Sequence, residues 1–382
     1  MDFTLPEVTE DLRGLARDIT EKVSTDDRVA RLEADDAALD DVLWRELGAA
    51  GLLGLEVGPE VAGDAGAGQS ILESITVAEQ LGRGLARVPY GVHAIAALPA
   101  IATHGSVALR GRLVGDAATG TAVLTVALEE DLGTGSDHPQ TLLSRTEHGW
   151  ALTGSKVNVA YAGAATAIVV NAMSPDGVRA VVIDADAAGI GLTPTPATGK
   201  TPTFVVDFDG VVVDDDHVLD GGAGTVADIV DRATLAVCAD QSGTLSRALE
   251  LTAAYAVERE QFGKPIGSFQ AVAQRLADGY IDTQGLSLTT LAAAWQFTRI
   301  ADADEDNDDG GLHVAVQTAK FWACDAGHRV AHTAVHVHGG VGLDTTHPVH
   351  RYFLRAKQNE YTLGSAPITL AAIGDVLAAA PA

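Results

Sequence analysis

Apolar residues recur at helical spacing over the first part of the chain. Leu12, Leu15, Ile19 and Val23 are separated by three, four and four positions, which places them on one face of a helix. The same spacing returns in several later stretches. We therefore predict an N-terminal helical domain over residues 1–119.

The periodicity changes near Gly120. The segments that follow are short, rich in Val, Ile and Thr, and separated by Gly, Asp and Pro turns, which is typical of strands. They cover 123–127, 149–157, 167–171, 179–183 and 203–213. We predict a middle β-domain over residues 120–222.

Long helical patterns return after the β-segments. They cover 225–256, 269–300 and 312–337, and they predict a C-terminal helical bundle over residues 223–382. The acidic loop 301–310 offers many carboxylates, but it lacks the ligand spacing and the distal Glu of an EF-hand. We interpret it as a solvated turn and expect no metal site.

The charge balance argues against one class of partner. Lys and Arg total 25 against 52 Asp and Glu, which gives a formal net charge of −27. So acidic a protein is a poor partner for nucleic acid. An anionic ligand needs positive side chains gathered at its site, so Arg and Lys residues near glycine turns carry particular weight.

The two cysteines, Cys238 and Cys324, fall within helical patterns. This placement is typical of buried thiols in a reducing compartment rather than of a disulfide. The N-terminus shows no basic segment followed by an apolar run, and no apolar run reaches membrane-spanning length. We expect a cytoplasmic protein without a membrane partner.

A turn between two helical patterns gathers a distinctive set of side chains. A helix ends near Arg259, a Gly- and Pro-containing turn follows, and a second helix opens at Ser268. This arrangement brings Arg259, Phe262 and Gln270 to the mouth between two helices. One cation, one aromatic ring and one amide suit a pyrophosphate and an adenine ring.

The stretch from Tyr255 to Gln270 closely resembles the signature of FAD-dependent acyl-CoA dehydrogenases. Further matching segments follow in that family's order, namely Gly133–Asp137, Gly154–Lys156, His336–Gly342 and Arg355–Lys357. The resemblance covers essentially the whole chain. It implies an α+β fold with an N-terminal helical domain, a middle β-barrel or sandwich and a C-terminal four-helix bundle. It also implies FAD as cofactor, an acyl-CoA substrate and an electron-transfer acceptor.

By this resemblance, six residues hold the adenosine and pyrophosphate portion of an FAD whose ring sits on a neighbouring subunit. They are Arg259, Phe262, Gln270, His336, Gly339 and Gly340. A double glycine lets backbone amides approach phosphate oxygens where a Cβ would obstruct them. His336 stands where the family usually has Gln, which keeps a donor but changes the contact.

The β-domain matches the family only in part. Thr134 and Ser136 lie in a segment that resembles the family's glycine-rich loop, whose serine reaches flavin phosphate or CoA. The family commonly has Trp-Ile-Thr against the flavin ring, whereas this chain has Asn158-Val159-Ala160. An aromatic face and a hydroxyl are both missing, so a flavin ring held here would be less well supported.

The family's reaction needs a carboxylate to remove a proton from the carbon α to the thioester carbonyl. The usual Glu position counts to Leu363, and the alternative position on the first long C-terminal helix counts to Ala233. Neither can accept a proton. Asp240 lies two turns beyond Ala233 and is the candidate base, or else a helix carboxylate paired with a nearby Arg. Asp231 and Glu360 are weaker candidates.

The tail from His347 to Lys357 resembles actinobacterial members of the family, several of which act on CoA thioesters of steroid side chains and assemble from two unlike subunits. We therefore expect FAD-dependent α,β-dehydrogenation of an acyl-CoA thioester, by a homo-oligomer with Asp240 as base or by a heterotetramer with a related subunit. Two alternatives stay open. One is a non-catalytic supporting subunit, and the other is a flavin-dependent oxidase or monooxygenase on the same fold.

Overall fold

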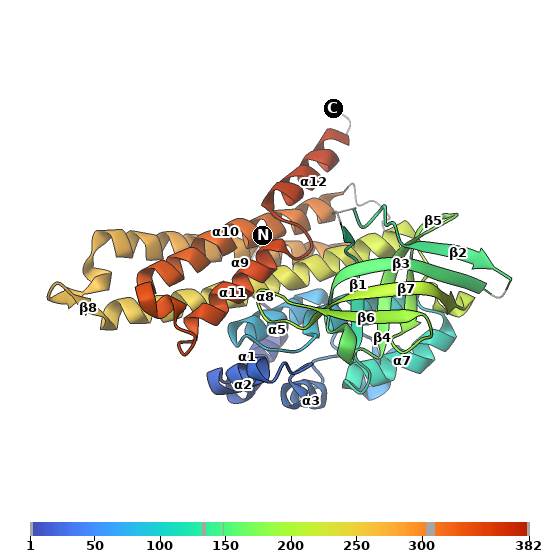
Figure 1. Ribbon diagram of the computed structural model, residues 1–382, viewed down its shortest axis with the longest axis horizontal. Coiled ribbons are helices and arrows are strands. Elements are labelled where there is room, and N and C mark those ends of the chain that lie inside the picture. Colours follow the sequence, from blue (N-terminus) through green and yellow to red (C-terminus); the bar gives the residue numbers. More distant parts are fainter. Residues whose placement is uncertain (1–2, 132–134, 148, 303–309, 380–382) are drawn as a thin grey trace.

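The computed structural model describes residues 3–131, 135–147, 149–302 and 310–379. Figure 1 shows an elongated molecule in three parts: N-terminal helices along one side, a curled β-sheet at one end, and long helices that run to the other end. The loop residues 303–309, on which the solvated-turn interpretation depends, lie outside the described residues.

The N-terminal part is a group of helices, some of which pack on the first long C-terminal helix. They are α1 (Glu7–Val23), α2 (Asp26–Ala34), α3 (Asp41–Ala49), α4 (Pro59–Ala62), α5 (Ile71–Arg83), a π-helical turn (Gly91–Ala97), α6 (Leu98–His104) and α7 (Val107–Thr119). Helix α5 begins at a capping box, in which Ser70 and Glu73 satisfy the first backbone amides. Its buried face then includes Ile75, Ala78 and Leu81.

The middle part is one mixed sheet. Its strands are β1 (Leu124–Ala127), β2 (Leu142–Thr146), β3 (Gly149–Ala160), β4 (Ala167–Ser174), β5 (Gly177–Asp184), β6 (Ile190–Thr195) and β7 (Thr203–Val213). The order is β1-β4-β2-β3-β7-β6, with β5 paired to β4 and β1 parallel to β4. Side chains alternate along β4: Val169 packs toward the helices, whereas Ile168 and Val170 pack inside the curl of the sheet.

The C-terminal part is a bundle of long helices. They are α8 (Ala223–Glu258), α9 (Gln270–Asp302), α10 (Gly311–His338), α11 (Val349–Tyr361) and α12 (Ala366–Ala379). A short hairpin, β8 (Glu260–Gln261) and β9 (Lys264–Pro265), joins α8 to α9 at the far end of the molecule. The predicted α+β fold, with helical domain, β-domain and helical bundle, is confirmed. The domain boundaries 1–119, 120–222 and 223–382 stay predictions.

The three parts share a core. His93, in the π-helical turn, is fully buried and bridges two of them: its Nε2 lies 3.0 Å from the carbonyl of Ala117, and its Nδ1 accepts from the amide of Leu124 at 2.9 Å. Burial lowers the pKa of His93 to about 4, against a smaller opposing effect of the Ala117 carbonyl. The neutral imidazole therefore ties the N-terminal helices to the sheet.

One stretch, Val349–Ala379, is apolar and long enough to cross a membrane by length and composition alone. The structure divides it into α11, which packs on α8 and α10, and α12, which leads away from the body (Figure 1). Length and composition are weak evidence, because core helices of other proteins pass the same test. The expected lack of a membrane partner stays a prediction.

Candidate cofactor and substrate site

A pocket lies where the three parts meet. It holds about 700 Å³ including its open mouth. Leu81, Val88 and Ala236 contribute to an apolar lining, which also draws residues from β3 and α11. Helices α5 and α8 approach closely here, since a Cβ on Gly82 or Gly243 would collide with the backbone of the other helix. An apolar cavity with a few polar groups suits a hydrophobic ligand.

Asp240 lines this pocket, but both of its oxygens already accept hydrogen bonds. Arg355 donates from Nε to Oδ2 at 2.9 Å and from Nη2 to Oδ1 at 2.8 Å, and Asn359 donates to Oδ2 at 2.5 Å. Burial alone would lower the pKa of Arg355, but the carboxylate of Asp240 outweighs it and raises the pKa. This geometry matches the paired-carboxylate interpretation, while the role of Asp240 as a base stays a prediction.

Both usual base positions carry hydrocarbon side chains. Ala233 is buried in an apolar cluster with Ala97 and Ile229, and Leu363 packs against the same cluster. Sequence counting therefore led from two distant segments to the same apolar cluster. That place contains alkyl side chains, which cannot take a proton.

The segment Asn158-Val159-Ala160 ends β3 beside the pocket. Asn158 has a left-handed backbone with φ of 55°, Val159 is buried in the sheet, and Ala160 lines the pocket. The next residue, Tyr161, is buried, also lines the pocket and also has a positive φ, 58°. Burial raises the pKa of Tyr161, although Arg355 and Arg87 act against it.

A buried polar network supports the loop that follows β1. Lys156, which has no exposed surface, donates to Glu130 Oε1 and to Asn171 Oδ1, each at 2.7 Å. Asn171 in turn donates to the backbone carbonyl of Ser136 at 2.7 Å. Burial lowers the pKa of Lys156 to about 8, against the pull of Glu130. Burial alone would raise the pKa of Glu130, but hydrogen bonds from Lys156 and Thr141 outweigh that effect and lower the pKa to about 2.

This network places Ser136, the predicted contact to flavin phosphate or CoA, at the rim of the β-domain. The other predicted contact in that loop, Thr134, lies outside the described residues.

The predicted adenosine contacts gather at the opposite end of the molecule. Arg259, Gln270, His336, Gly339 and Gly340 are all exposed, and Phe262 is 93% exposed. The two segments that carry them are joined by a stack of Tyr255 on His338, with ring centroids 4.4 Å apart. Open space surrounds the positions where Gly339 and Gly340 would carry a Cβ, so a ligand can approach their backbone.

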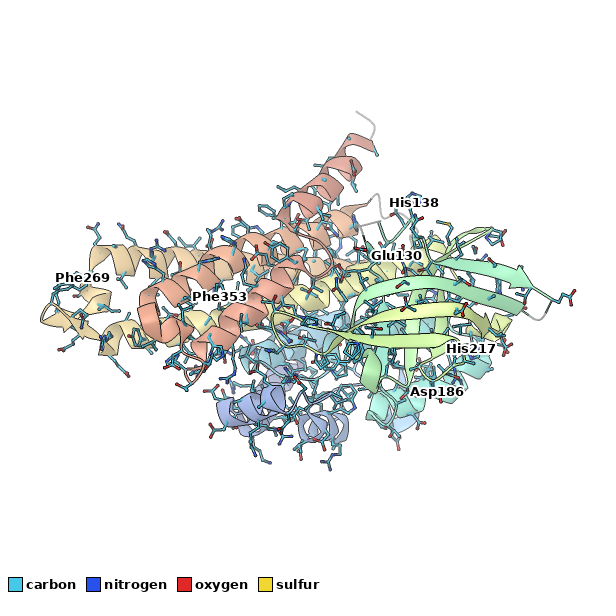
Figure 2. The ribbon with its side chains drawn as sticks, viewed as in Figure 1. Glu130, His138, Asp186, His217, Phe269 and Phe353 are labelled. Carbon is cyan, nitrogen blue, oxygen red and sulfur yellow. The ribbon has the colours of Figure 1, made fainter. Side chains whose placement is uncertain are left out.

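The two ends are far apart in one chain. Figure 2 labels Phe269, next to Gln270, at the tip of the helical bundle, and Glu130 within the β-domain, well separated along the long axis. One chain therefore cannot place its hairpin and its own β-domain on the same dinucleotide. A site that uses both kinds of residue is shared between chains.

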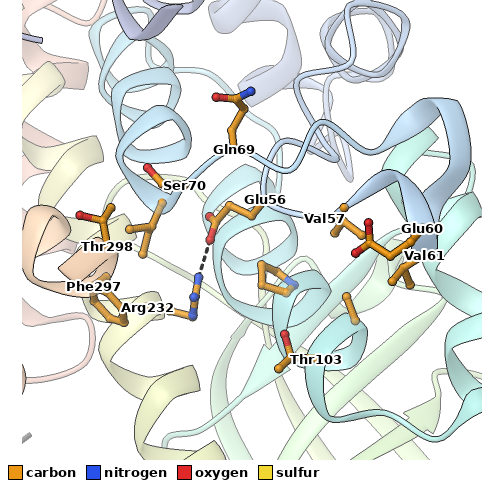
Figure 3. Close-up of a pocket in the computed structure, with 14 residues that line it drawn as sticks. Glu56, Val57, Glu60, Val61, Gln69, Ser70, Thr103, Arg232, Phe297 and Thr298 are labelled. Carbon is orange, nitrogen blue, oxygen red and sulfur yellow. Dashed lines mark hydrogen bonds and ion pairs between the residues drawn. The ribbon is translucent and has the colours of Figure 1, made fainter. Parts of the chain in front are cut away.

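A second hollow lies on the other side of the N-terminal helices and is shown in Figure 3. Arg232 there donates to Glu56 at 2.5 Å and to Asp228 at 2.9 Å, and its guanidinium lies 5.3 Å from the ring of Phe297. Burial raises the pKa of Glu56, against the effect of Arg232. Across the described residues, no group of three or more His, Cys, Asp or Glu side chains is placed to hold a metal ion.

The sequence analysis missed Glu129. Its Oε1 accepts a hydrogen bond from the backbone amide of Leu363 at 3.2 Å, although 234 residues separate the two. The available signal was a pair of acids, Glu129 and Glu130, directly after an apolar strand. The other missed side chain is Arg355, which was assigned to a motif but not to Asp240.

FAD fits the hairpin end of the chain but not its β-domain end. The exposed hairpin and the glycine turn offer a cation, an aromatic ring, an amide and accessible backbone to an adenosine pyrophosphate. The β-domain end does not fit a flavin ring in the same way, because Ala160 offers no hydroxyl and Glu129 bridges to Leu363.

Comparison with known proteins gives one family. Residues 6–121 match the model of the acyl-CoA dehydrogenase N-terminal domain, and residues 220–378 match that of the C-terminal domain. The acyl-CoA dehydrogenase FadE27 of Mycobacterium tuberculosis is 42% identical over 382 residues, with all of both chains covered. Acyl-CoA dehydrogenase FadE28 of the same organism is 31% identical and covers 87% of this chain and 92% of its own length.

Solved structures agree. A chain of the ChsE4-ChsE5 complex from Mycobacterium tuberculosis superposes with a TM-score of 0.92 at 42% identity, with both chains covered in full. A chain of a Tcur3481-Tcur3483 steroid ACAD variant gives 0.89 at 38% identity, covering 98% of this chain and 99% of that one. The family models and these relatives define a flavoprotein oxidoreductase of the CH-CH class. The chain belongs to the acyl-CoA dehydrogenase family, and the predicted family, reaction class and FAD cofactor are confirmed.

Proposed function

We propose that this chain is the supporting subunit of a two-subunit acyl-CoA dehydrogenase. It contributes the adenosine and pyrophosphate contacts of an FAD site, while a related partner subunit contributes the ring contacts and the base. The observation that carries this proposal is that both base positions carry hydrocarbon side chains: Ala233 is buried in an apolar cluster, and Leu363 packs against that cluster.

The chemistry explains why that observation matters. FAD, when bound, supplies the hydride acceptor for the β carbon of the thioester. The protein must supply a base for the α proton, within hydrogen-bond reach and with a free lone pair. In this pocket the candidate carboxylate is Asp240, whose charge is paired with the Arg355 guanidinium and whose Oδ2 also accepts a hydrogen bond from Asn359.

The hairpin end of the chain contributes contacts to FAD rather than a base. Arg259 supplies positive charge to a pyrophosphate, and Phe262 offers a ring that is 93% exposed. On a chain with a net charge of −27, a cation placed at an open glycine turn favours an anionic ligand locally. Gly339 and Gly340 add backbone donors.

The two-subunit assembly is supported by the similar structures. Two of them, at 42% and 38% identity, are named as pairs of unlike chains, the ChsE4-ChsE5 complex and the Tcur3481-Tcur3483 steroid ACAD. We propose that the acyl group of the shared substrate is bulky, with a steroid side chain as the leading candidate. The electron acceptor and the cytoplasmic location stay predictions.

The test is turnover of a steroid-side-chain CoA thioester by this chain alone, by the related partner alone, and by the two together, with a dye as electron acceptor. We expect turnover only from the pair. Turnover by this chain alone, abolished in Asp240→Asn, would instead establish the self-sufficient enzyme.

A further inference from the structure

Glu129 ties the β-domain to the C-terminal bundle. Its side-chain Oε1 accepts from the amide of Leu363 at 3.2 Å. Its backbone carbonyl accepts from the amide of Val157 at 2.9 Å, which fixes Glu129 beside β3. One residue is thus held on both sides of the boundary between the sheet and the helices.

The same carboxylate reaches Asn158. The Asn158 side chain approaches it as a hydrogen-bond donor, and the buried Lys320 acts on it through space. Burial raises the pKa of Glu129, with the Leu363 amide, Asn158 and Lys320 acting against that rise. Glu129 is half-buried, and the groups that interact with its carboxylate come from the sheet and from the C-terminal bundle.

The two positions that Glu129 joins are unusual in their backbone. Asn158 has φ of 55° and Leu363 has φ of 56°, both left-handed and both non-glycine. Such conformations persist where surrounding contacts over-determine them. The carboxylate of Glu129 accepts a hydrogen bond from the Leu363 amide and lies near the Asn158 side chain.

By resemblance, these two positions are also among those at which the chain departs from its family, with Asn158 in the place of the ring-packing Trp and Leu363 in the place of the base. We infer that Glu129 closes the flavin-ring seat of this chain by bridging Asn158 and Leu363, and so makes the β-domain exclude the ring. This inference rests on the proposed function and names the residue responsible.

The ring is excluded because it would separate the Glu129 carboxylate from its hydrogen-bond donors. A flat ring laid between the two positions would take the Leu363 amide and the Asn158 side chain away from Glu129. The carboxylate would then be buried without its donors, which is strongly unfavourable. Removing the carboxylate removes that penalty.

The experiment measures binding of lumiflavin, the bare tricyclic ring, to the isolated full-length chain by quenching of its fluorescence. We expect no saturable binding by the wild type. Glu129→Gln keeps an oxygen for the Leu363 amide but removes the charge, so its affinity for lumiflavin should lie between those of the wild type and of Glu129→Ala. Glu129→Ala should bind lumiflavin at least about tenfold more tightly, equivalent to about 1.4 kcal/mol.

Asp186→Ala is the matched control, because Asp186 is an exposed carboxylate of the same domain. If Glu129→Ala does not fold, as judged by circular dichroism, Glu129→Val replaces it and fills part of the space without reaching Leu363. A folded variant that binds no better than the wild type overturns the inference and leaves the proposed function standing.

Two other results are equally decisive. A wild-type chain that binds lumiflavin as tightly as the variant overturns the inference. So does a Glu129→Gln complex that keeps its flavin but loses more than about a hundredfold in turnover, because Glu129 would then be a proton acceptor. Turnover by the isolated wild-type chain would instead contradict the proposed function itself.

Discussion

Asp240 and Arg355 form a two-pronged ion pair between α8 and α11, with N–O distances of 2.9 and 2.8 Å. The pair lines the pocket where the three parts of the molecule meet, with both side chains mostly buried. Its effect is to join two helices rather than to leave a carboxylate free.

Replacing Asp240 tests whether it is structural. Asp240→Asn leaves the Arg355 guanidinium without a counter-charge and should lower the free energy of unfolding by about 2 to 4 kcal/mol. The double variant with Arg355→Met should recover part of that loss. Turnover per folded complex should change less than about tenfold, whereas loss of a general base costs about 10²- to 10⁴-fold. Urea unfolding and steady-state kinetics provide the two readouts.

Arg259 tests the contribution of this chain to FAD binding. Arg259→Ala removes a charged donor from an exposed turn, so the affinity of the two-subunit complex for FAD should fall about 10- to 100-fold. The stability of the isolated chain should change by less than about 0.5 kcal/mol. Arg45→Ala, at an exposed position on α3, serves as the control. Unaltered FAD affinity in Arg259→Ala would remove this end from the cofactor site.

The Lys156–Glu130 pair should show strong coupling. Lys156→Met or Glu130→Gln alone strands a buried charge and should cost about 3 to 5 kcal/mol, and the double variant should cost less than the sum of the two. A double-mutant cycle by urea unfolding measures the coupling. Additive effects would show that the pair does not act as one unit.

The lowered pKa of His93 predicts that the stability of the folded protein depends on pH. Its folded pKa of about 4 lies below the ordinary 6.5, so the folded state binds fewer protons between these values. Its contribution is therefore complete above pH 6.5 and is lost as the pH falls toward 4, a loss of about 3 kcal/mol. In His93→Gln this part of the slope should vanish from urea midpoints measured across the interval. His138→Gln, at an exposed histidine, should keep it.

Periodicity was enough to predict the helical, β and helical order of the chain, because each long helix and buried strand carries its own apolar face. Strands β2 and β6 were missed because most of their residues are exposed or only partly buried, so no regular alternation marks them. Their place in the sheet is set by pairing with β3 and β7. Tertiary pairing of this kind leaves little local signal.

The candidate site was predictable where a motif is local and unpredictable where partners are distant. Arg259, Phe262 and Gln270 lie within one turn, so a single stretch of sequence revealed them. Asp240 and Arg355 are 115 residues apart, and Glu129 and Leu363 are 234 apart. Spacing along one chain cannot show that such groups share a hydrogen bond.

The most direct test of the central claim is the FAD content of the purified proteins, measured from the visible absorption spectrum against protein concentration. The account predicts a colourless isolated chain and, after co-expression with the related subunit, one FAD for each pair of unlike chains. A yellow isolated chain that holds one FAD per chain and oxidises an acyl-CoA thioester would contradict it.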